Sequence, residues 1–136
     1  MSMTQTRVTS VSLPVSVTAP AFARRAVIER LGPTFPAQRM HDAELLITEV
    51  VTNAVRHAGL DEKDLIDVTL RDDEGSVVIE VGDPGSGFAS GALSRTANPR
   101  ENGGWGMLLL DRLSDGWGFR DRPGGGSVVW FRVDPR

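Results

Sequence analysis

The 136-residue sequence predicts a single α+β domain, a two-layer sandwich in which a mixed, mainly antiparallel sheet is covered on one face by about three helices. Two features predict this class. Segments with the composition of strands follow one another largely in pairs that form hairpins, and amphipathic helical segments lie between these pairs in the sequence. The length suits one hydrophobic core, because a domain of this size buries about two thirds of its unfolded surface. We expect a frayed stretch over residues 1–7 and one domain over residues 8–136.

The composition excludes several classes of protein. The chain has 15 basic and 18 acidic residues, a net charge of −3, no Tyr and no basic block, so nucleic acid is not an expected partner. The absence of Cys excludes disulfides and zinc sites held by thiolates. No apolar run approaches the roughly 20 residues that span a bilayer, and the first residues do not have the pattern of a signal peptide. We therefore expect a cytoplasmic protein without a membrane partner.

The first half of the chain predicts one strand and two helices. Residues 8–17 alternate apolar and small polar side chains, as in a half-buried strand. Pro20 marks the start of a first helix, and the pair Gly32-Pro33 ends it. The expected apolar face of this helix consists of Phe22, Ala26, Val27 and Leu31. The strongest helical period follows at residues 39–57 and ends before Gly59. Its apolar stripe consists of Leu46, Ile47, Val50, Val51, Ala54, Val55 and Ala58.

The second half predicts two hairpins separated by a loop and a helix. Residues 66–70 and 77–81 are rich in β-branched side chains and flank a turn of acidic residues and Gly. Residues 84–106 show no sustained period, which is typical of a functional or mobile loop. Helical character resumes over residues 105–113. Two further strands are expected at 117–120 and 127–133, on either side of the turn 122–126.

The first candidate site lies on the long helix, where Glu49, Asn53 and His57 follow one another at i, i+4 and i+8. This spacing places the three side chains on one face, about 6 Å apart along the axis. The amide oxygen of Asn53 is a suitable ligand for a magnesium ion that also binds phosphate, and the Glu49 carboxylate can orient or deprotonate a hydroxyl or water. The alternative is a pair of polar residues capped by water, with His57 as a structural residue at the helix end.

The second candidate site is the segment 83–87, which reads Asp-Pro-Gly-Ser-Gly and follows a predicted strand. The Asp83 carboxylate can accept a hydrogen bond from an exocyclic amine such as adenine N6, an interaction of about 1.5–3 kcal/mol when it is sheltered. Gly85 and Gly87 would let the backbone approach a base or a phosphate closely. The same residues also fit an ordinary turn.

The third candidate site is a glycine-rich loop that opens directly into a helix and consists of Gly103, Gly104, Trp105, Gly106 and Met107. The first amides and the dipole of a helix hold anionic oxygens, so the segment predicts a phosphate cradle. It is not a Walker A loop, and a dinucleotide-binding fold is excluded because the expected βαβ unit and acidic partner are missing. The alternative is a flexible loop with an incidental helix start.

Taken together, these segments resemble the nucleotide-binding boxes of the GHKL ATPase superfamily, which includes gyrase, histidine kinases and a mismatch-repair protein. Residues 49–57 resemble the N box, residues 83–87 the first glycine box and residues 104–106 the second. The resemblance extends from the first strand to Val133. Within the superfamily, the short chain is most similar to bacterial anti-sigma-factor serine/threonine kinases and related stand-alone ATP-binding regulators.

The resemblance implies a role for each matching residue. Asn53 would hold magnesium, Glu49 would act as general base toward a serine or threonine hydroxyl, and Asp83 would bind adenine. Ser127 matches the hydroxyl residue that supports adenine recognition. The glycines would bound the base and the triphosphate of ATP, with residues 88–103 as a lid.

Two functions follow from this resemblance. One is a serine/threonine kinase that phosphorylates an antagonist protein and, in another state, holds a sigma factor. The other is a non-catalytic ATP-gated binding module, in which the nucleotide orders the lid. Related kinases often carry a basic residue before the second glycine box, whereas this chain has Asn102, with Arg95 or Arg100 as substitutes. A histidine-kinase reading lacks support, because neither His41 nor His57 lies in a separate helical hairpin. An exposed sheet edge or helix face would also allow a homodimer to form.

Overall fold

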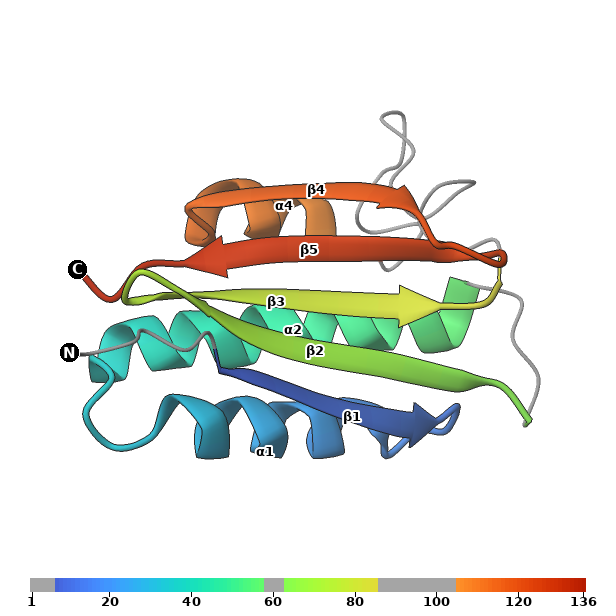
Figure 1. Ribbon diagram of the computed structural model, residues 1–136, viewed down its shortest axis with the longest axis horizontal. Coiled ribbons are helices and arrows are strands. Elements are labelled where there is room, and N and C mark those ends of the chain that lie inside the picture. The colour runs from blue at the N-terminus through green and yellow to red at the C-terminus, as the bar shows by residue number, and fades with distance from the viewer. Residues whose placement is uncertain (1–6, 58–62, 86–104) are drawn as a thin grey trace, which may run out of the picture.

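The computed structural model describes residues 7–57, 63–85 and 105–136 and confirms the α+β prediction (Figure 1). Five strands form one sheet in the order β1-β2-β3-β5-β4, and every pairing between the described strands is antiparallel. The described helices cover one face of this sheet, and none of them is long and apolar enough to cross a membrane. The elements are β1 (Val8–Pro14), α1 (Ala19–Leu31), α2 (Ala37–His57), β2 (Leu65–Asp73), β3 (Ser76–Asp83), α4 (Trp105–Leu113), β4 (Gly116–Asp121) and β5 (Ser127–Val133).

The hairpin of β2 and β3 closes through the two residues Glu74 and Gly75, which have φ angles of 52° and 92°. Two successive residues with positive φ are typical of the tight turns that match the twist of a hairpin. The turn sets the register, in which Asp73 pairs with Ser76, and the fully buried apolar residues of the two strands, such as Leu70 and Ile79, face the helices. The predicted hairpin is confirmed.

Helix α1 begins and ends close to the predicted residues, but its buried face differs. Gly32 ends the helix with a φ of 74°, and its N–H donates to the carbonyl oxygen of Ile28 at 3.0 Å. The buried residues are Ala19, Ala23 and Val27, whereas Phe22 is 55% exposed. Small side chains at these positions let the helix lie close to its neighbours. The predicted face is therefore confirmed for Val27 and for the partly buried Leu31 but wrong for Phe22. Strand β1 also ends earlier than expected, at Pro14.

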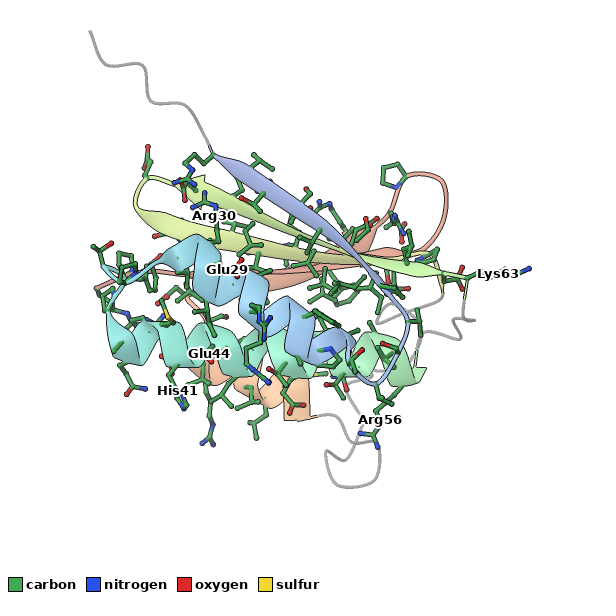
Figure 2. All side chains as sticks on the ribbon, turned by 90° about the horizontal axis from the view of Figure 1, so that it is seen from below. Glu29, Arg30, His41, Glu44, Arg56 and Lys63 are labelled. Atoms are coloured by element: carbon green, nitrogen blue, oxygen red, sulfur yellow. The ribbon has the colours of Figure 1, made fainter. Side chains whose placement is uncertain are left out.

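Helix α1 is joined to the sheet by an ion pair at its C-terminal end (Figure 2). The Arg30 guanidinium lies 2.8 Å from the Asp72 carboxylate of β2, and it also donates to the carbonyl oxygen of Arg7 at 3.1 Å. The Arg30 side chain is only 7% exposed. The pair therefore holds α1 against the β1–β2 edge of the sheet.

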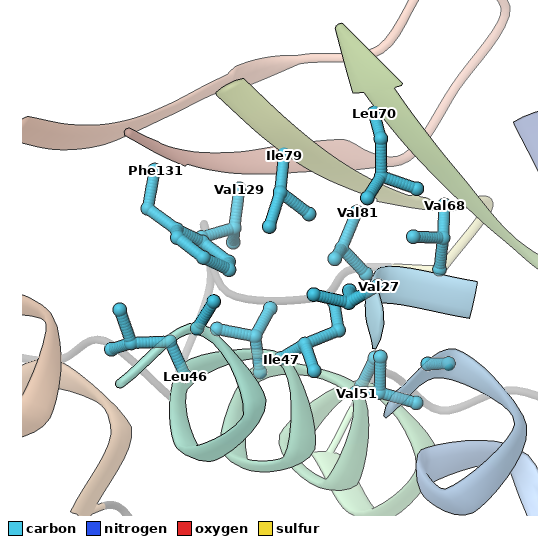
Figure 3. Packing of buried hydrophobic residues seen from close by; sticks show 14 of the residues in the cluster. Val27, Leu46, Ile47, Val51, Val68, Leu70, Ile79, Val81, Val129 and Phe131 are labelled. Atoms are coloured by element: carbon cyan, nitrogen blue, oxygen red, sulfur yellow. The ribbon is translucent and has the colours of Figure 1, made fainter. Parts of the chain in front are cut away.

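The hydrophobic core lies between α2 and the helix-facing side of the sheet (Figure 3). Leu46, Ile47 and Val51 project from α2 toward residues of the central strands, among them Ile79 and Phe131. All five are fully buried, and burial of a side chain of this size contributes about 1.5–3 kcal/mol. The stripe predicted on α2 is confirmed up to Ala54, Val55 is only partly buried, and Ala58 lies outside the described residues.

At one end of the molecule, Arg39, near the start of α2, connects several elements through its guanidinium group. Its Nε donates to the carbonyl oxygen of Asp134 at 2.9 Å, and its Nη1 lies 2.6 Å from the Asp42 carboxylate. The same guanidinium pairs with Asp115, just before β4. Ser76, the first residue of β3, donates to the Asp134 carboxylate at 2.5 Å. The starts of α2, β3 and β4 and the end of β5 therefore meet here, at what we call the Arg39 end.

The lengths of the elements determine what meets at the opposite end. From Arg39 to Asn53 a helix rises about 21 Å, and from Ser76 to Asp83 a strand extends about 23 Å. Helix α2 and strand β3 contact each other and run in the same direction, so their last residues arrive together (Figure 1). Strand β5 runs the opposite way and begins there with Ser127. We call this the Asp83 end.

The turn between β4 and β5 packs tightly against the Asp83 end. Its glycines 124, 125 and 126 all have positive φ, between 86° and 110°. A Cβ atom on Gly126 would lie 1.9 Å from the carbonyl oxygen of Asp83 and 2.7 Å from the Cα of Pro84. A Cβ on Gly124 would meet nothing within 4 Å. Only glycine at position 126 permits this approach of the turn to β3.

This contrast predicts unequal effects of two alanine substitutions. Gly124→Ala should lower the free energy of unfolding by about 1–2 kcal/mol, the cost of a left-handed residue with a side chain. Gly126→Ala adds a backbone clash and should lower it by about 3 kcal/mol or more. Urea unfolding of the two variants measures the difference. Equal losses would show that the turn does not pack against β3 in this way.

Candidate functional site

Asp83 and Ser127 are cross-strand neighbours at the Asp83 end. The register of β3 and β5 pairs Asp83 with Ser127 and, two residues further along, Val81 with Val129. Because side chains alternate along a strand, the two polar residues project toward the helices, as the two valines do. Asp83 is 2% exposed and Ser127 is 1% exposed. The hydrophobic core therefore ends here in a carboxylate beside a hydroxyl.

The Asp83 carboxylate is oriented by its own chain. The N–H of Gly85 donates to Asp83 Oδ1 at 2.9 Å, a contact in which an Asp side chain closes a local turn. The second carboxylate oxygen keeps its capacity to accept a hydrogen bond. Thus the turn expected in this segment and a binding role for Asp83 are compatible with each other.

Asn53 is carried toward the same end by α2. It lies seven residues after Leu46, or two helical turns, so the two side chains share one face. Leu46 lies opposite Phe131 of β5 (Figure 3). Ser127 lies four residues before Phe131 on the same face of β5. Because α2 and β5 run in opposite directions, the residue two turns beyond Leu46 approaches the start of β5.

Three buried atoms at this end have no hydrogen-bond partner within the described part of the chain. They are the Oδ1 and Nδ2 of Asn53 and the Oγ of Ser127, and each side chain is 1% exposed. An unpaired buried polar group costs about 1–3 kcal/mol, and such groups are nearly always paired in folded proteins. A polar ligand with donors and acceptors would satisfy all three. The residues therefore fit a site for a ligand such as a nucleotide.

The electrostatics of Asp83 differ from those of an ordinary surface carboxylate. Burial raises the pKa of Asp83 from 3.8 to about 6, while the Gly85 N–H and the positive charge of Arg122 oppose this rise and Asp64 adds to it. Asp83 therefore titrates not far below neutral pH. Sequence reasoning did not identify Arg122, and the only available signal was its place in the glycine-rich turn before Ser127.

Glu49 lies one turn before Asn53 on α2. Burial raises the pKa of Glu49, and the charge of Arg56 partly opposes this effect. Figure 2 places Arg56 near the C-terminal end of the helix. A carboxylate with a raised pKa is a stronger base, which suits a group that accepts a proton from a hydroxyl.

The start of α4 also faces the Asp83 end. The helix begins at Trp105, as predicted, and ends at Leu113, close to the Arg39 guanidinium, which donates to the Leu113 carbonyl oxygen at 3.3 Å. Helix α4 thus runs opposite to α2, and its first turn, with Gly106, is directed away from the Arg39 end. Met107 packs against the hydrophobic core. Its side chain therefore has a packing role, and its place in the phosphate cradle stays a prediction.

The other residues predicted for the site are not all described. Gly87, Gly103 and Gly104 lie outside the described residues, and so does the predicted lid over 88–103. The structure thus pairs Asp83 with Ser127 across β3 and β5, and α2 carries Asn53 toward the same end, with Glu49 one turn before it. Their roles toward a nucleotide stay predictions.

Comparison with protein families gives a match over most of the chain. Residues 14–133 match the histidine kinase-like ATPase domain. No curated protein sequence matches significantly. The match begins at the end of β1 and includes every other described strand and helix.

Solved structures share this fold at low sequence identity. The crystal structure of the RsbU and RsbW domains of Rv1364c from Mycobacterium tuberculosis is 20% identical, with a TM-score of 0.70 over 94% of this chain and 32% of that chain. The histidine kinase domain of the Erythrobacter litoralis EL346 blue-light activated histidine kinase is also 20% identical, with a TM-score of 0.53 over 90% of this chain and 61% of that chain. The chain thus spans less than two thirds of either protein. The family match shows that this chain belongs to the histidine kinase-like ATPase domain family.

Proposed function

We propose that the protein is an ATP-binding regulatory serine/threonine kinase of the anti-sigma-factor type, which phosphorylates an antagonist protein and sequesters a sigma factor. The observation that carries the ATP site is the buried Asn53 amide, which has no partner among the described residues and lies toward the end where Asp83 and Ser127 also lie. The family match supports ATP as the ligand. The likeness to a chain that contains an RsbW domain supports a regulatory kinase, although it extends to the fold alone.

Each residue has a defined task in this proposal. The Asp83 carboxylate accepts a hydrogen bond from the adenine amine, and the Ser127 hydroxyl beside it contacts the same base. Asn53 Oδ1 holds magnesium, which neutralises charge on the phosphate oxygens when it is bound. Amides at the start of α4, which opens with Trp105, lie at the helix end that favours anions.

Glu49 is the proposed general base. Its place one turn before Asn53 puts the carboxylate on the same face of α2 as the magnesium ligand. There it accepts the proton of a serine or threonine hydroxyl of the antagonist protein. The hydroxyl oxygen forms a bond to the terminal phosphorus of ATP, and the bond from that phosphorus to the bridging oxygen breaks, so that ADP leaves. Burial keeps the Glu49 carboxylate more basic than an exposed one.

The proposed role of Asp83 predicts that adenine recognition depends on pH. Because the charged carboxylate is the better acceptor, ATP affinity should fall as the pH drops through about 6, where Asp83 of the free protein becomes protonated. Asp83→Asn should weaken ATP binding about 10- to 100-fold and reduce the preference over GTP. Calorimetric titrations with ATP and GTP test this. Asp73→Asn, at the Arg39 end, where Asp73 pairs with Ser76 and its side chain is 45% exposed, is the control and should leave the affinity unchanged.

The raised pKa of Asp83 also predicts that the site destabilises the nucleotide-free protein. A carboxyl group whose pKa is higher in the folded state binds more protons when folded, so stability falls as the pH rises from about 4 to about 6. Asparagine removes the charge and keeps an oxygen for the Gly85 N–H. Asp83→Asn should therefore be more stable than the original protein at about pH 8, with the difference shrinking toward about pH 4. Urea unfolding at both pH values measures this, and a variant less stable at both would contradict it.

The proposed base predicts a selective loss of turnover. Glu49→Gln should reduce phosphorylation of a purified antagonist protein by about 10²- to 10⁴-fold, with ATP affinity retained. The assay uses ATP labelled on the terminal phosphate, with magnesium. Glu44→Gln, on the same helix (Figure 2), is the control and should retain activity.

Two other outcomes of this assay are informative. Full activity of Glu49→Gln would refute the assigned base. Tight ATP binding without transfer to any antagonist protein would instead favour the ATP-gated binding module, which Asn102 before the second glycine box also favours.

A further inference from the structure

Arg122 occupies the turn that carries Ser127 into the site. Its N–H donates to the carbonyl oxygen of Gly126 at 3.0 Å, and its own carbonyl oxygen accepts from the N–H of Gly125 at 3.0 Å. These two bonds close the turn between β4 and β5. The backbone of Arg122 is therefore part of the structure that presses Gly126 against β3.

The Arg122 side chain crosses the face of the sheet that is turned away from the helices. It runs over Gly82, where an added Cβ would lie 3.8 Å from the Arg122 Nε. Its Nη2 reaches the Asp67 carboxylate of β2 at 2.5 Å. The other Asp67 oxygen accepts a hydrogen bond from Ser12 Oγ of β1 at 2.6 Å. One side chain thus connects the turn to two strands on the far side of β3.

This connection ends at Asp83. Gly126 lies against the Asp83 carbonyl oxygen, so a displacement of the turn moves both the backbone of Asp83 and the neighbouring Ser127. A displacement of one ångström or less is enough to spoil a hydrogen bond to a base edge. Tethering the turn to Asp67 therefore fixes the geometry of the pair that faces adenine in the proposed function.

We propose that Arg122 is a positioning residue for adenine recognition, acting through its ion pair with Asp67 across the open face of the sheet. The proposal rests on the adenine-binding role assigned to Asp83 and Ser127. Arg122 acts in a second way through its charge, which favours the ionised form of Asp83 from the opposite side of the sheet. Among the described residues, the other charge that acts on this carboxyl group is that of Asp64, which disfavours its ionisation.

The ion pair between Arg122 and Asp67 is poorly explained as a contribution to the stability of the fold alone. The side chains of Arg122 and Asp67 are 28% and 36% exposed, and ion pairs this accessible add little to the free energy of folding. The neighbouring pair of Arg120 and Glu80 lies on the same face, with an N–O distance of 3.2 Å. In the described part of the chain Arg120 pairs with Glu80 and not with Asp67, so it provides a matched control on the same hairpin.

The test compares Arg122→Gln, Asp67→Asn and Arg120→Gln in the full chain by calorimetric titration with ATP and magnesium over a range of pH. Arg122→Gln should weaken ATP binding about tenfold and move the pH midpoint of binding upward by about 0.5 or more. Asp67→Asn should weaken binding, with a smaller change of midpoint, because the Arg122 charge remains. Arg120→Gln should match the original protein in both respects, and all three should unfold at nearly the same urea concentration. An unchanged affinity and midpoint for Arg122→Gln would overturn the proposal.

A second measurement separates this proposal from the proposed function. Carbon-13 NMR titration of the Asp83 carboxyl group in the nucleotide-free protein should give a higher pKa in Arg122→Gln than in the original protein or in Arg120→Gln. If the original protein does not bind ATP, or if Asp83→Asn binds it equally well, the proposed function fails whatever Arg122 does. If Asp83→Asn loses ATP binding and Arg122→Gln changes neither the affinity nor the Asp83 titration, the positioning role alone fails.

Discussion

The site depends on the guanidinium of Arg39, which fixes where α2 starts relative to the sheet. Arg39 joins α2 to the segments around Asp115 and Asp134, and Ser76 brings the start of β3 to the same place. Because α2 and β3 then cover about the same length, their far ends arrive together. A shift of α2 by one turn would move Asn53 by about 5 Å and separate it from the end of β3.

The two ends of the molecule use their polar groups in opposite ways. At the Arg39 end, carboxylates and guanidinium groups are paired with one another, and Asp115 alone accepts from Arg39, Arg136 and the N–H of Asp134. At the Asp83 end, a buried amide and a hydroxyl have no partner among the described residues, and a buried carboxylate has a raised pKa. The first arrangement stabilises the fold, whereas the second costs stability that a bound ligand can restore.

Much of the site was predictable from the sequence, because its residues lie on or beside regular elements. The spacing of Glu49 and Asn53 places them on one helical face, and the position of Asp83 after an apolar run places it at a strand end. Ser127 was expected only through the resemblance to a known superfamily. Arg122 was missed, because its partner Asp67 is 55 residues away in the chain and no local pattern connects them. The prediction for the apolar face of α1 was wrong at Phe22, since hydrophobicity alone favoured it over the small Ala23, which is buried instead.

The sequence by itself determined the helices and strands, because hydrophobic periodicity, glycine and proline each act on the conformation of only a few neighbouring residues. It predicted the long amphipathic helix, both hairpins and the α+β class before any contact was known. Only the tertiary structure decided that Gly126 must lie against Asp83 and that Arg122 reaches across β3 to Asp67. It also decided that the Asn53 amide is buried. These contacts and this burial depend on the register of β3 with β5 and on the position of the start of α2 relative to the sheet. Both are set by pairings between residues far apart in the chain.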